Sequence, residues 1–387
     1  MQTRHRVIYG NAGSMQAIRS ESVDLVVTSP PYPMIAMWDE MFSHQSPDVG
    51  RALKIQDGFS AFEAMHRVLD PVWGEVNRVL KTGGFVCINV GDATRTINGN
   101  FGLYPNHMRI IKRMLALGFT PLPCILWRKQ TNAPNKFMGS GMLPAGAYVT
   151  LEHEYILIFR KGPKRVFSKE EDKKSRRESA IFWEERNLWY SDVWFDVKGA
   201  LQALNNKDSR KRSAAYPFEI VYRLINMYSV KGAVVLDPFS GTGTTTAAAV
   251  ASGRNSIGYE IDSTLECIIE RPGDLIVDSS RQLIRRRLAG HLEFVVSRLK
   301  TGSRLKYVNQ HYGFPVMTAQ ERDLIISDPL EIRHSGKGVY DVLYADVPQK
   351  EFMKNWETEL QRANLDNIEE SMRRAGSKKN FVQSKLF

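Results

Sequence analysis

Short apolar runs alternate with amphipathic stretches along most of this chain. Runs of consecutive apolar residues predict buried strands, and apolar residues spaced at helical intervals predict helices. The alternation of the two favours an α/β fold built on a mostly parallel sheet. The predicted strands are Arg6–Tyr9, Asp24–Thr28, Phe85–Val90, Phe119–Arg128, Tyr155–Phe159, Ala233–Asp237 and Asn255–Tyr259.

Helices are predicted between these strands, each with a glycine or proline near one end. The apolar positions from Phe62 to Leu80 predict a helix that is kinked near Pro71 and stopped by Gly83-Gly84. Residues 34–58 show no clear period, and we predict a loop there. Two further helices are expected, from Pro105 to Leu117, ended by Gly118, and from Pro217 to Tyr228, with the proline in the first turn.

The last third of the chain has a different pattern. Residues 282–300 predict a helix with one apolar side and one heavily basic side, the latter carrying Arg281, Arg285, Arg286, Arg287 and Arg298. Residues 305–350 hold several short strand-like runs. The tail from Arg373 is basic and polar, and we expect it to be frayed.

Composition narrows the class of protein. The chain has 387 residues, of which 43% are hydrophobic and 25% charged, as is typical of soluble globular proteins. No apolar run is long enough to span a membrane and the N-terminus does not read as a signal peptide, so we expect a cytoplasmic protein. Three scattered cysteines, Cys87, Cys124 and Cys267, form neither a disulfide framework nor a metal-binding pattern. The net charge of +11 is compatible with a nucleic-acid partner.

The first candidate for chemistry is Ser29-Pro30-Pro31-Tyr32, directly after the strand that ends at Thr28. Each proline fixes its φ angle and lacks an N–H, so the turn cannot continue as a helix. The carbonyls of Ser29 and Pro30 should therefore point outwards, beside one hydroxyl and one aromatic ring. Such a turn is suited to holding a planar amine, although a proline-rich turn that merely closes a strand would have the same residues.

The second candidate is a glycine-rich turn about 200 residues later. Asp237-Pro-Phe-Ser-Gly241-Thr-Gly243 follows a predicted strand and precedes a helix of small residues, Ala247 to Ala251. Glycines allow close approach of a ligand to the backbone, and a helix N-terminus adds N–H donors. Glu260 ends the next strand, where an acid holds the ribose hydroxyls in nucleoside-binding α/β folds.

Together these two segments resemble the amino-methylating DNA methyltransferases, which use S-adenosyl-L-methionine. The order of the motifs is the permuted order of the group called beta, and the resemblance covers roughly residues 5–262. It implies a class I (Rossmann-like) methyltransferase fold with a seven-stranded mixed sheet. It also implies four regions: a catalytic half, a target-recognition region, a cofactor-binding half, and a C-terminal extension that either contacts DNA or braces the fold. These are residues 1–161, 162–212, 213–265 and 266–387.

The resemblance assigns roles residue by residue. The Ser29 hydroxyl and the Pro30 carbonyl would accept hydrogen bonds from the target amine, next to Pro31, while Tyr32 would stack on a base flipped out of the duplex. Asn11 stands where the family often has Asp, and a plain turn residue is the alternative there. No metal site is expected. The residues expected to bind S-adenosylmethionine are Asn11, Tyr216, Pro217, Asp237, Pro238, Phe239, Ser240, Gly241, Thr242, Gly243, Thr244 and Glu260.

The residue before the prolines bears on the target base. Serine is usually associated with N4 of cytosine and aspartate with N6 of adenine, so we expect an N4-cytosine enzyme, with N6-adenine as the alternative. The expected partner is double-stranded DNA, and a companion restriction endonuclease is a candidate partner. The target sequence and the oligomeric state are left open. A DNA-binding module without catalysis is the alternative from another class.

Rival chemistries fit the sequence less well. Cys124 follows a proline, as in C5-cytosine methyltransferases, but it lies in an apolar run and favours a core cysteine. The glycine turn is close to a dinucleotide fingerprint, yet Thr246 replaces its last small residue, and no lysine follows as in an NTPase loop. His153-Glu154 is interpreted as a structural pair. Aromatics and basic residues in 162–212 suit base contacts and a packed core equally.

Overall fold

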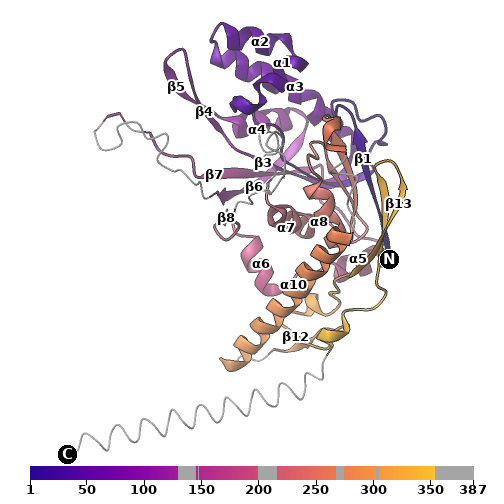
Figure 1. Ribbon diagram of the computed structural model, residues 1–387. Coiled ribbons are helices and arrows are strands. Elements are labelled where there is room, and N and C mark those ends of the chain that lie inside the picture. The colour runs from indigo at the N-terminus through magenta and orange to yellow at the C-terminus, as the bar shows by residue number, and fades with distance from the viewer. Residues whose placement is uncertain (130–144, 147, 199–215, 267–273, 302–304, 354–387) are drawn as a thin grey trace, which may run out of the picture.

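The computed structural model describes residues 1–129, 145–146, 148–198, 216–266, 274–301 and 305–353. One ten-stranded sheet, ordered β13-β14-β1-β10-β9-β2-β3-β7-β6-β8, runs through this part of the molecule (Figure 1). Its strands are β1 (Gln2–Tyr9), β2 (Val23–Thr28), β3 (Leu80–Val90), β6 (Phe119–Arg128), β7 (His153–Lys161), β8 (Val193–Trp194), β9 (Val234–Asp237), β10 (Asn255–Glu260), β13 (Pro329–Gly336) and β14 (Val339–Tyr344). Two small pairs complete the strands: β4 (Ala93–Ile97) with β5 (Asn100–Tyr104), and β11 (Tyr307–Val308) with β12 (Pro315–Val316).

The seven predicted strands form the uninterrupted centre of this sheet. The strands β1, β10, β9, β2 and β3 are parallel to one another, whereas β7 is antiparallel to both β3 and β6. The antiparallel hairpin β13–β14 then extends the sheet beyond β1, and β8 extends it beyond β6. The sheet is therefore mixed, as the resemblance implied. The alternation of strands and helices predicted the parallel arrangement found from β1 to β3, but it did not predict the antiparallel strand β7.

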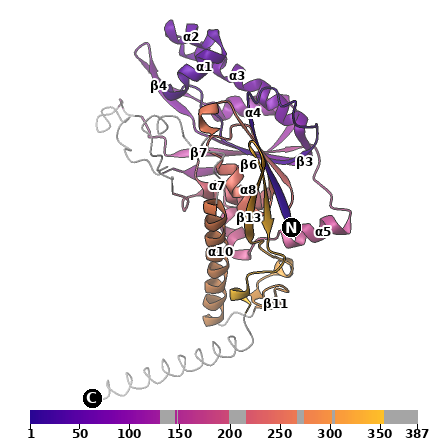
Figure 2. The same cartoon turned by 45° about the vertical axis from the view of Figure 1, so that its right-hand side comes forward.

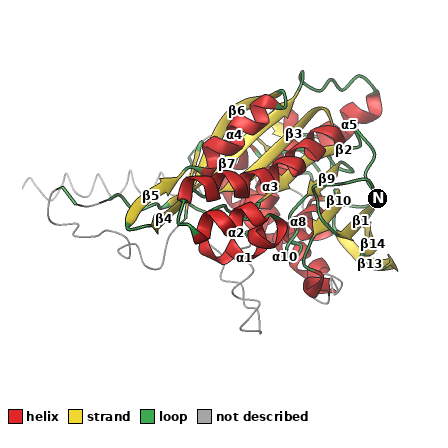
Figure 3. Cartoon of the chain, turned by 90° about the horizontal axis from the view of Figure 1, so that it is seen from above, coloured by secondary structure: helices red, strands yellow, loops and turns green. Residues whose placement is uncertain are grey.

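One face of the sheet is covered by the helices that precede or follow β3 (Figure 3). They are α1 (Asp39–Gln45), α2 (Pro47–Lys54), α3 (Gly58–Val79) and α4 (Asn106–Ala116). The prediction of a loop for residues 34–58 is wrong, because α1, α2 and the 3₁₀ turn Ala36–Trp38 lie there. Both helices are short, so a search for helical periodicity misses them, but each buries side chains such as Phe42 and Val49.

The end of α3 also differs from the prediction. The helix ends at Val79, and Leu80 already has an extended backbone and begins β3. Gly83 and Gly84 therefore lie within the strand rather than stopping the helix. Pro71 is inside α3, as the sequence indicated. The helix and strand join without a loop, and Val76, Val79 and Leu80 at the junction are fully buried.

The opposite face carries α6 (Trp183–Trp189), α7 (Phe218–Tyr228) and α8 (Thr244–Ser252), with α5 (Glu170–Glu178) nearby in chain order. Four apolar residues of α7 are buried against β2, β9 and α8, namely Ile220, Val221, Leu224 and Ile225. Pro217 stands immediately before the helix. Three aromatic residues of the predicted target-recognition region, Phe182, Trp189 and Trp194, are core residues, whereas Phe195 is exposed. The basic patch at 207–212 lies outside the described residues.

The C-terminal region is packed onto this second face. Helix α10 (Asp274–Lys300) starts earlier than predicted and runs past α6 and α7 towards β11 (Figure 2). Short 3₁₀ turns at Ser263–Leu265, Ala319–Glu321 and Lys350–Phe352 accompany it. The tail from Arg373 lies outside the described residues. In the part of the chain that the structure describes, no helix is both long enough and apolar enough to cross a membrane.

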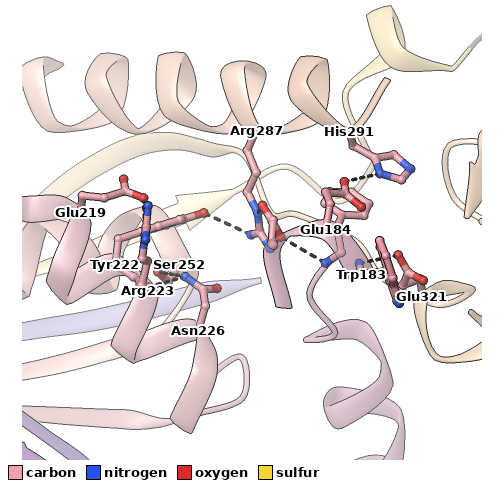
Figure 4. A network of polar contacts seen from close by, with 12 residues as sticks. Trp183, Glu184, Glu219, Tyr222, Arg223, Asn226, Ser252, Arg287, His291 and Glu321 are labelled. Carbon is pink, nitrogen blue, oxygen red and sulfur yellow. Dashed lines mark hydrogen bonds and ion pairs between the residues drawn. The ribbon is translucent and has the colours of Figure 1, made fainter. Parts of the chain in front are cut away.

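The basic side that the sequence predicts for α10 includes one arginine, Arg287, that packs inward against α6 and α7. Its guanidinium is buried over the rings of Phe182, Trp189 and Tyr222 and pairs with both carboxylate oxygens of Glu185 on α6. Figure 4 shows Arg287 and His291 pointing from α10 towards α6 and α7. These contacts fix the appended region to the sheet-bearing part of the molecule.

Candidate functional site

The carboxyl ends of five neighbouring parallel strands meet at one edge of the sheet, and predicted site residues follow four of them. Asn11 follows β1, Glu260 ends β10, Asp237 ends β9 and Ser29 follows β2. The Thr28 hydroxyl, one residue before Ser29, donates a 2.6 Å hydrogen bond to Asp237 Oδ1. The proline turn and the glycine turn therefore open on the same edge, although 209 positions separate the bonded residues.

Asp237 organises the glycine turn from beneath. Besides Thr28, it accepts hydrogen bonds from the Phe239 N–H at 3.0 Å and from the Thr245 hydroxyl at 2.5 Å. The Tyr216 hydroxyl lies 2.9 Å from the same Thr245 oxygen, which brings the segment before α7 to the turn. Burial raises the pKa of Asp237 and, far more strongly, that of Tyr216. Both oxygens of Asp237 are occupied by protein donors, so its direct contribution is to shape the turn.

The glycine turn itself presents backbone to open space. Gly241 and Gly243 have φ angles of +52° and +89°, in the left-handed region that favours glycine. A Cβ atom on either would meet no atom within 4 Å. Helix α8 starts at Thr244, directly after the turn, so its first N–H groups face the same region. This arrangement fits a ligand that lies against the backbone at a helix N-terminus.

The remaining residues of this turn are placed around that space. Pro238 and Ser240 are buried, whereas Thr242 and Thr244 are half-exposed. Phe239 is half-buried and packs edge-to-face against Trp73 of α3, with ring centroids 6.0 Å apart. The turn is thus anchored to both helical layers.

Glu260 and Asn11 lie side by side at the neighbouring strand ends. The Gly10 N–H donates to the Glu260 carbonyl at 2.8 Å. The Glu260 carboxylate accepts the N–H of Gly241 at 2.8 Å and that of Asp262 at 2.7 Å, and burial raises its pKa. Asn11 is exposed, and its Oδ1 accepts the Gly13 N–H at 2.7 Å, the contact that a turn residue makes. Its expected contact with a ligand stays a prediction.

The proline turn is held from the other side by β3 and β7. Pro30 is buried, and Ser29, Pro31 and Tyr32 are half-buried. The Ser29 and Tyr32 hydroxyl oxygens are 3.1 Å apart, and Tyr32 donates to Glu154 Oε2 at 2.9 Å. Asn106 on α4 donates to the Pro33 carbonyl at 3.1 Å, which ties the end of the turn to α4. Burial and the Glu154 charge hold the pKa of Tyr32 well above its ordinary value.

Asn89 was missed by the sequence reasoning, and Glu154, which it interpreted as part of a structural pair with His153, belongs to the same cluster. Asn89 donates from Nδ2 to Tyr32 at 2.8 Å and to Glu154 at 2.7 Å, and Glu154 also pairs with Lys129 at 2.7 Å. Asn89 is fully buried and Glu154 nearly so. A signal was present, because Asn89 is a polar residue near the end of the apolar run Phe85–Val90 and Glu154 directly precedes the apolar run Tyr155–Phe159. Their contact with Tyr32 could not be read without knowing that β3 lies between β2 and β7.

Other candidates lie away from this chemistry. Cys124 is half-buried in β6 and packs against the core. Among the side chains that the structure describes, no group of three or more His, Cys, Asp or Glu is arranged to hold a metal ion. The site therefore consists of an open glycine turn, a hydroxyl-bearing proline turn and a buried polar cluster behind it.

Comparison with known proteins gives consistent matches. The family model described as N6_N4_Mtase: DNA methylase matches residues 23–271. The type II methyltransferase M.MthZI of Methanothermobacter thermautotrophicus is 50% identical over 353 residues, covering 91% of this chain and 98% of that protein. TTHA0409 of Thermus thermophilus, assigned as a DNA modification methylase and solved in complex with S-adenosyl-L-methionine, aligns with a TM-score of 0.53. Its identity is 32%, over 68% of this chain and 92% of that chain.

A more distant structure shares the fold. The PvuII DNA methyltransferase (cytosine-N4-specific) aligns with a TM-score of 0.50 and 16% identity, over 73% of this chain and 93% of that chain. At this identity the likeness concerns the arrangement of strands and helices.

Proposed function

The chain belongs to the N6/N4 DNA methylase family, and we propose that it transfers a methyl group from S-adenosyl-L-methionine to the exocyclic N4 of cytosine in duplex DNA. Its fold is that of the class I methyltransferases, with three further strands on the mixed sheet. The observation that carries the proposal is the Thr28–Asp237 bond, because it sets Ser29 beside the glycine turn at one sheet edge. Serine in place of aspartate before the prolines favours cytosine over adenine.

The proline turn activates the amine in this proposal. An exocyclic amine is a poor nucleophile because its lone pair is delocalised into the ring. Ser29 Oγ and the Pro30 carbonyl accept its two hydrogens, which draws the nitrogen towards a tetrahedral geometry with its lone pair facing the glycine turn. No strong base is needed, since the proton becomes acidic once the nitrogen carries positive charge. Catalysis then consists of orientation and electrostatic stabilisation.

The glycine turn holds the methyl donor. Gly241, Gly243 and the first N–H groups of α8 face the open space described above, and Glu260 lies where the family holds the ribose hydroxyls. Tyr216 and Pro217 border the same turn through Thr245, and Asn11 follows the neighbouring strand. When bound, S-adenosylmethionine supplies an electrophilic methyl group on a sulfonium. The complex of TTHA0409, at 32% identity, supports this donor.

Tyr32 receives the base in the same proposal. The target must leave the duplex stack, at a cost of a few kcal/mol, and an aromatic ring at the site recovers part of that cost by stacking. We assign target recognition to residues 162–212 and the sheet-bearing halves to 1–161 and 213–265. The similarity to a type II methyltransferase supports a place in a restriction-modification system, with a companion endonuclease as partner.

The test is chemical analysis of DNA from a host that lacks DNA methylation and expresses this chain. Digested nucleosides are separated by mass spectrometry, and the same DNA is sequenced for modified bases to give their context. We expect N4-methylcytosine, which disappears when Ser29→Ala is expressed instead. N6-methyladenine alone would move the target to adenine. Unmodified DNA from a folded, S-adenosylmethionine-binding protein would overturn the proposal.

A further inference from the structure

We propose that Glu154, together with Asn89, fixes the Ser29 hydroxyl as a hydrogen-bond acceptor for the target amine. The inference rests on the proposed function, because it gives Ser29 its role in that reaction. Glu154 and Asn89 are positioning residues here: they contact Tyr32, and Tyr32 contacts Ser29. The direction of each hydrogen bond, followed from the buried carboxylate outwards, leads to this assignment.

The orientation of the Asn89 amide is set by the carboxylate. Asn89 Nδ2 lies 2.7 Å from Glu154 Oε2, and a carboxylate can only accept. Turning the amide over would place its oxygen against that carboxylate, so the nitrogen must face Glu154 and Tyr32. As a result, Asn89 Oδ1 is buried with no hydrogen-bond partner among the described residues. The donors of Asn89 are therefore both committed to Glu154 and Tyr32.

The Tyr32 hydroxyl has one proton and three polar neighbours. Its raised pKa keeps it protonated. Asn89 donates to its oxygen at 2.8 Å, and Glu154 Oε2, whose carboxylate pairs with Lys129, accepts from it at 2.9 Å. The phenolic proton therefore points at Glu154. With the phenolic proton directed at Glu154, Ser29 is left as the donor in the 3.1 Å hydrogen bond between the two hydroxyls.

The single proton of Ser29 is thus directed inwards, and its lone pairs remain for the amine. A carboxylate in this position would accept by its nature, but a serine hydroxyl can either donate or accept. Glu154 accepts the Tyr32 proton, and Tyr32 in turn accepts the Ser29 proton, so the Ser29 oxygen is left to accept from the amine. Lys129 holds the other carboxylate oxygen at 2.7 Å from the half-exposed side of the site, which keeps Oε2 turned towards Tyr32.

The experiment is a double-mutant cycle on the full-length protein with Glu154→Leu, Tyr32→Phe and both together. We measure kcat and KM on a methylatable DNA and the S-adenosylmethionine affinity. Each single variant should lower kcat on the order of 10²-fold, as when one oriented polar contact is lost at a reacting group. The double variant should be no worse than the poorer single variant, because both changes break the same chain of bonds. S-adenosylmethionine affinity should stay at the wild-type value.

Two further variants separate this role from a structural one. Glu152→Leu is the matched control, since Glu152 is half-exposed, pairs with Arg128 and should leave kcat unchanged. Glu154→Gln keeps an acceptor oxygen, so it should retain more activity than Glu154→Leu, and it also serves if the leucine variant fails to fold. Wild-type turnover in Glu154→Leu, or losses that multiply in the double variant, would overturn the inference. A wild-type protein that methylates no DNA amine would instead overturn the proposed function.

Discussion

Ser29 stands one residue beyond a strand whose six residues are all buried, so its position is set by the core rather than by the turn alone. The hydroxyl is then directed by Tyr32, and the neighbouring Pro30 carbonyl has no helical partner to accept from. At the scale of single residues, the geometry of the site therefore depends on contacts between neighbouring side chains as well as on the turn itself. The same holds for Asp237, whose three donors fix the glycine turn.

The first prediction concerns the proline turn. Ser29→Ala removes one acceptor for the amine, and Tyr32→Ala removes the stacking ring, so each should lower kcat by about 10²- to 10³-fold. Neither residue lies on the glycine turn, so S-adenosylmethionine binding, measured by calorimetry, should be nearly intact. Full turnover in either variant would count against the catalytic assignment.

At the scale of elements, α10 acts as a brace for the segment between the two motifs. Arg287 bonds Glu185 on α6 and the Tyr222 hydroxyl on α7, and His291 Nδ1 lies 2.7 Å from a Glu184 oxygen. The heavily basic side that the sequence predicts for this helix is therefore partly structural. Charge alone cannot distinguish a DNA-facing arginine from one buried against aromatic rings and a carboxylate.

The second prediction tests this brace. Arg287→Met leaves the largely buried Glu185 carboxylate without its partner and should lower the free energy of unfolding by about 3 kcal/mol, the lower end of the range for a buried ion pair. The neighbouring Arg286 is exposed, so Arg286→Met should change stability by no more than about 0.5 kcal/mol. Urea unfolding followed by circular dichroism measures both. Equal effects in the two variants would contradict the structural role of Arg287.

At the scale of the whole molecule, one sheet edge collects residues from distant parts of the chain. The strands that bear them are neighbours in the sheet, and helical layers pack against both of its faces. The net charge of +11 acts on DNA over the entire surface, independently of any single contact.

The third prediction concerns this charge. Affinity for duplex DNA should fall steeply with salt, with a slope of log K against log salt of about −0.9 for each phosphate that the protein neutralises. Fluorescence anisotropy of a labelled duplex at several salt concentrations measures the slope. An affinity that did not change with salt would show that phosphate contacts contribute little.

The sequence by itself determined the seven central strands, the helix after Pro217 and the two motif turns. These depend on local rules: the period of apolar residues, the fixed φ of proline and the freedom of glycine at Gly241 and Gly243. Local rules missed α1 and α2, because both helices are too short to show a period. They also placed Gly83-Gly84 at a helix end, since glycine is common at helix ends and depleted in strands, whereas here the pair lies within β3.

Only the tertiary structure decided which polar residues meet. Asn89 and Glu154 are 65 positions apart and became partners of Tyr32 because β7 inserts antiparallel between β3 and β6. Likewise, Arg287 is buried because α10 folds back onto α6 and α7, and β13–β14 join the sheet because β1 offers an edge. Backbone conformation follows from neighbours along the chain, whereas hydrogen-bond partners follow from the order in which strands and helices pack.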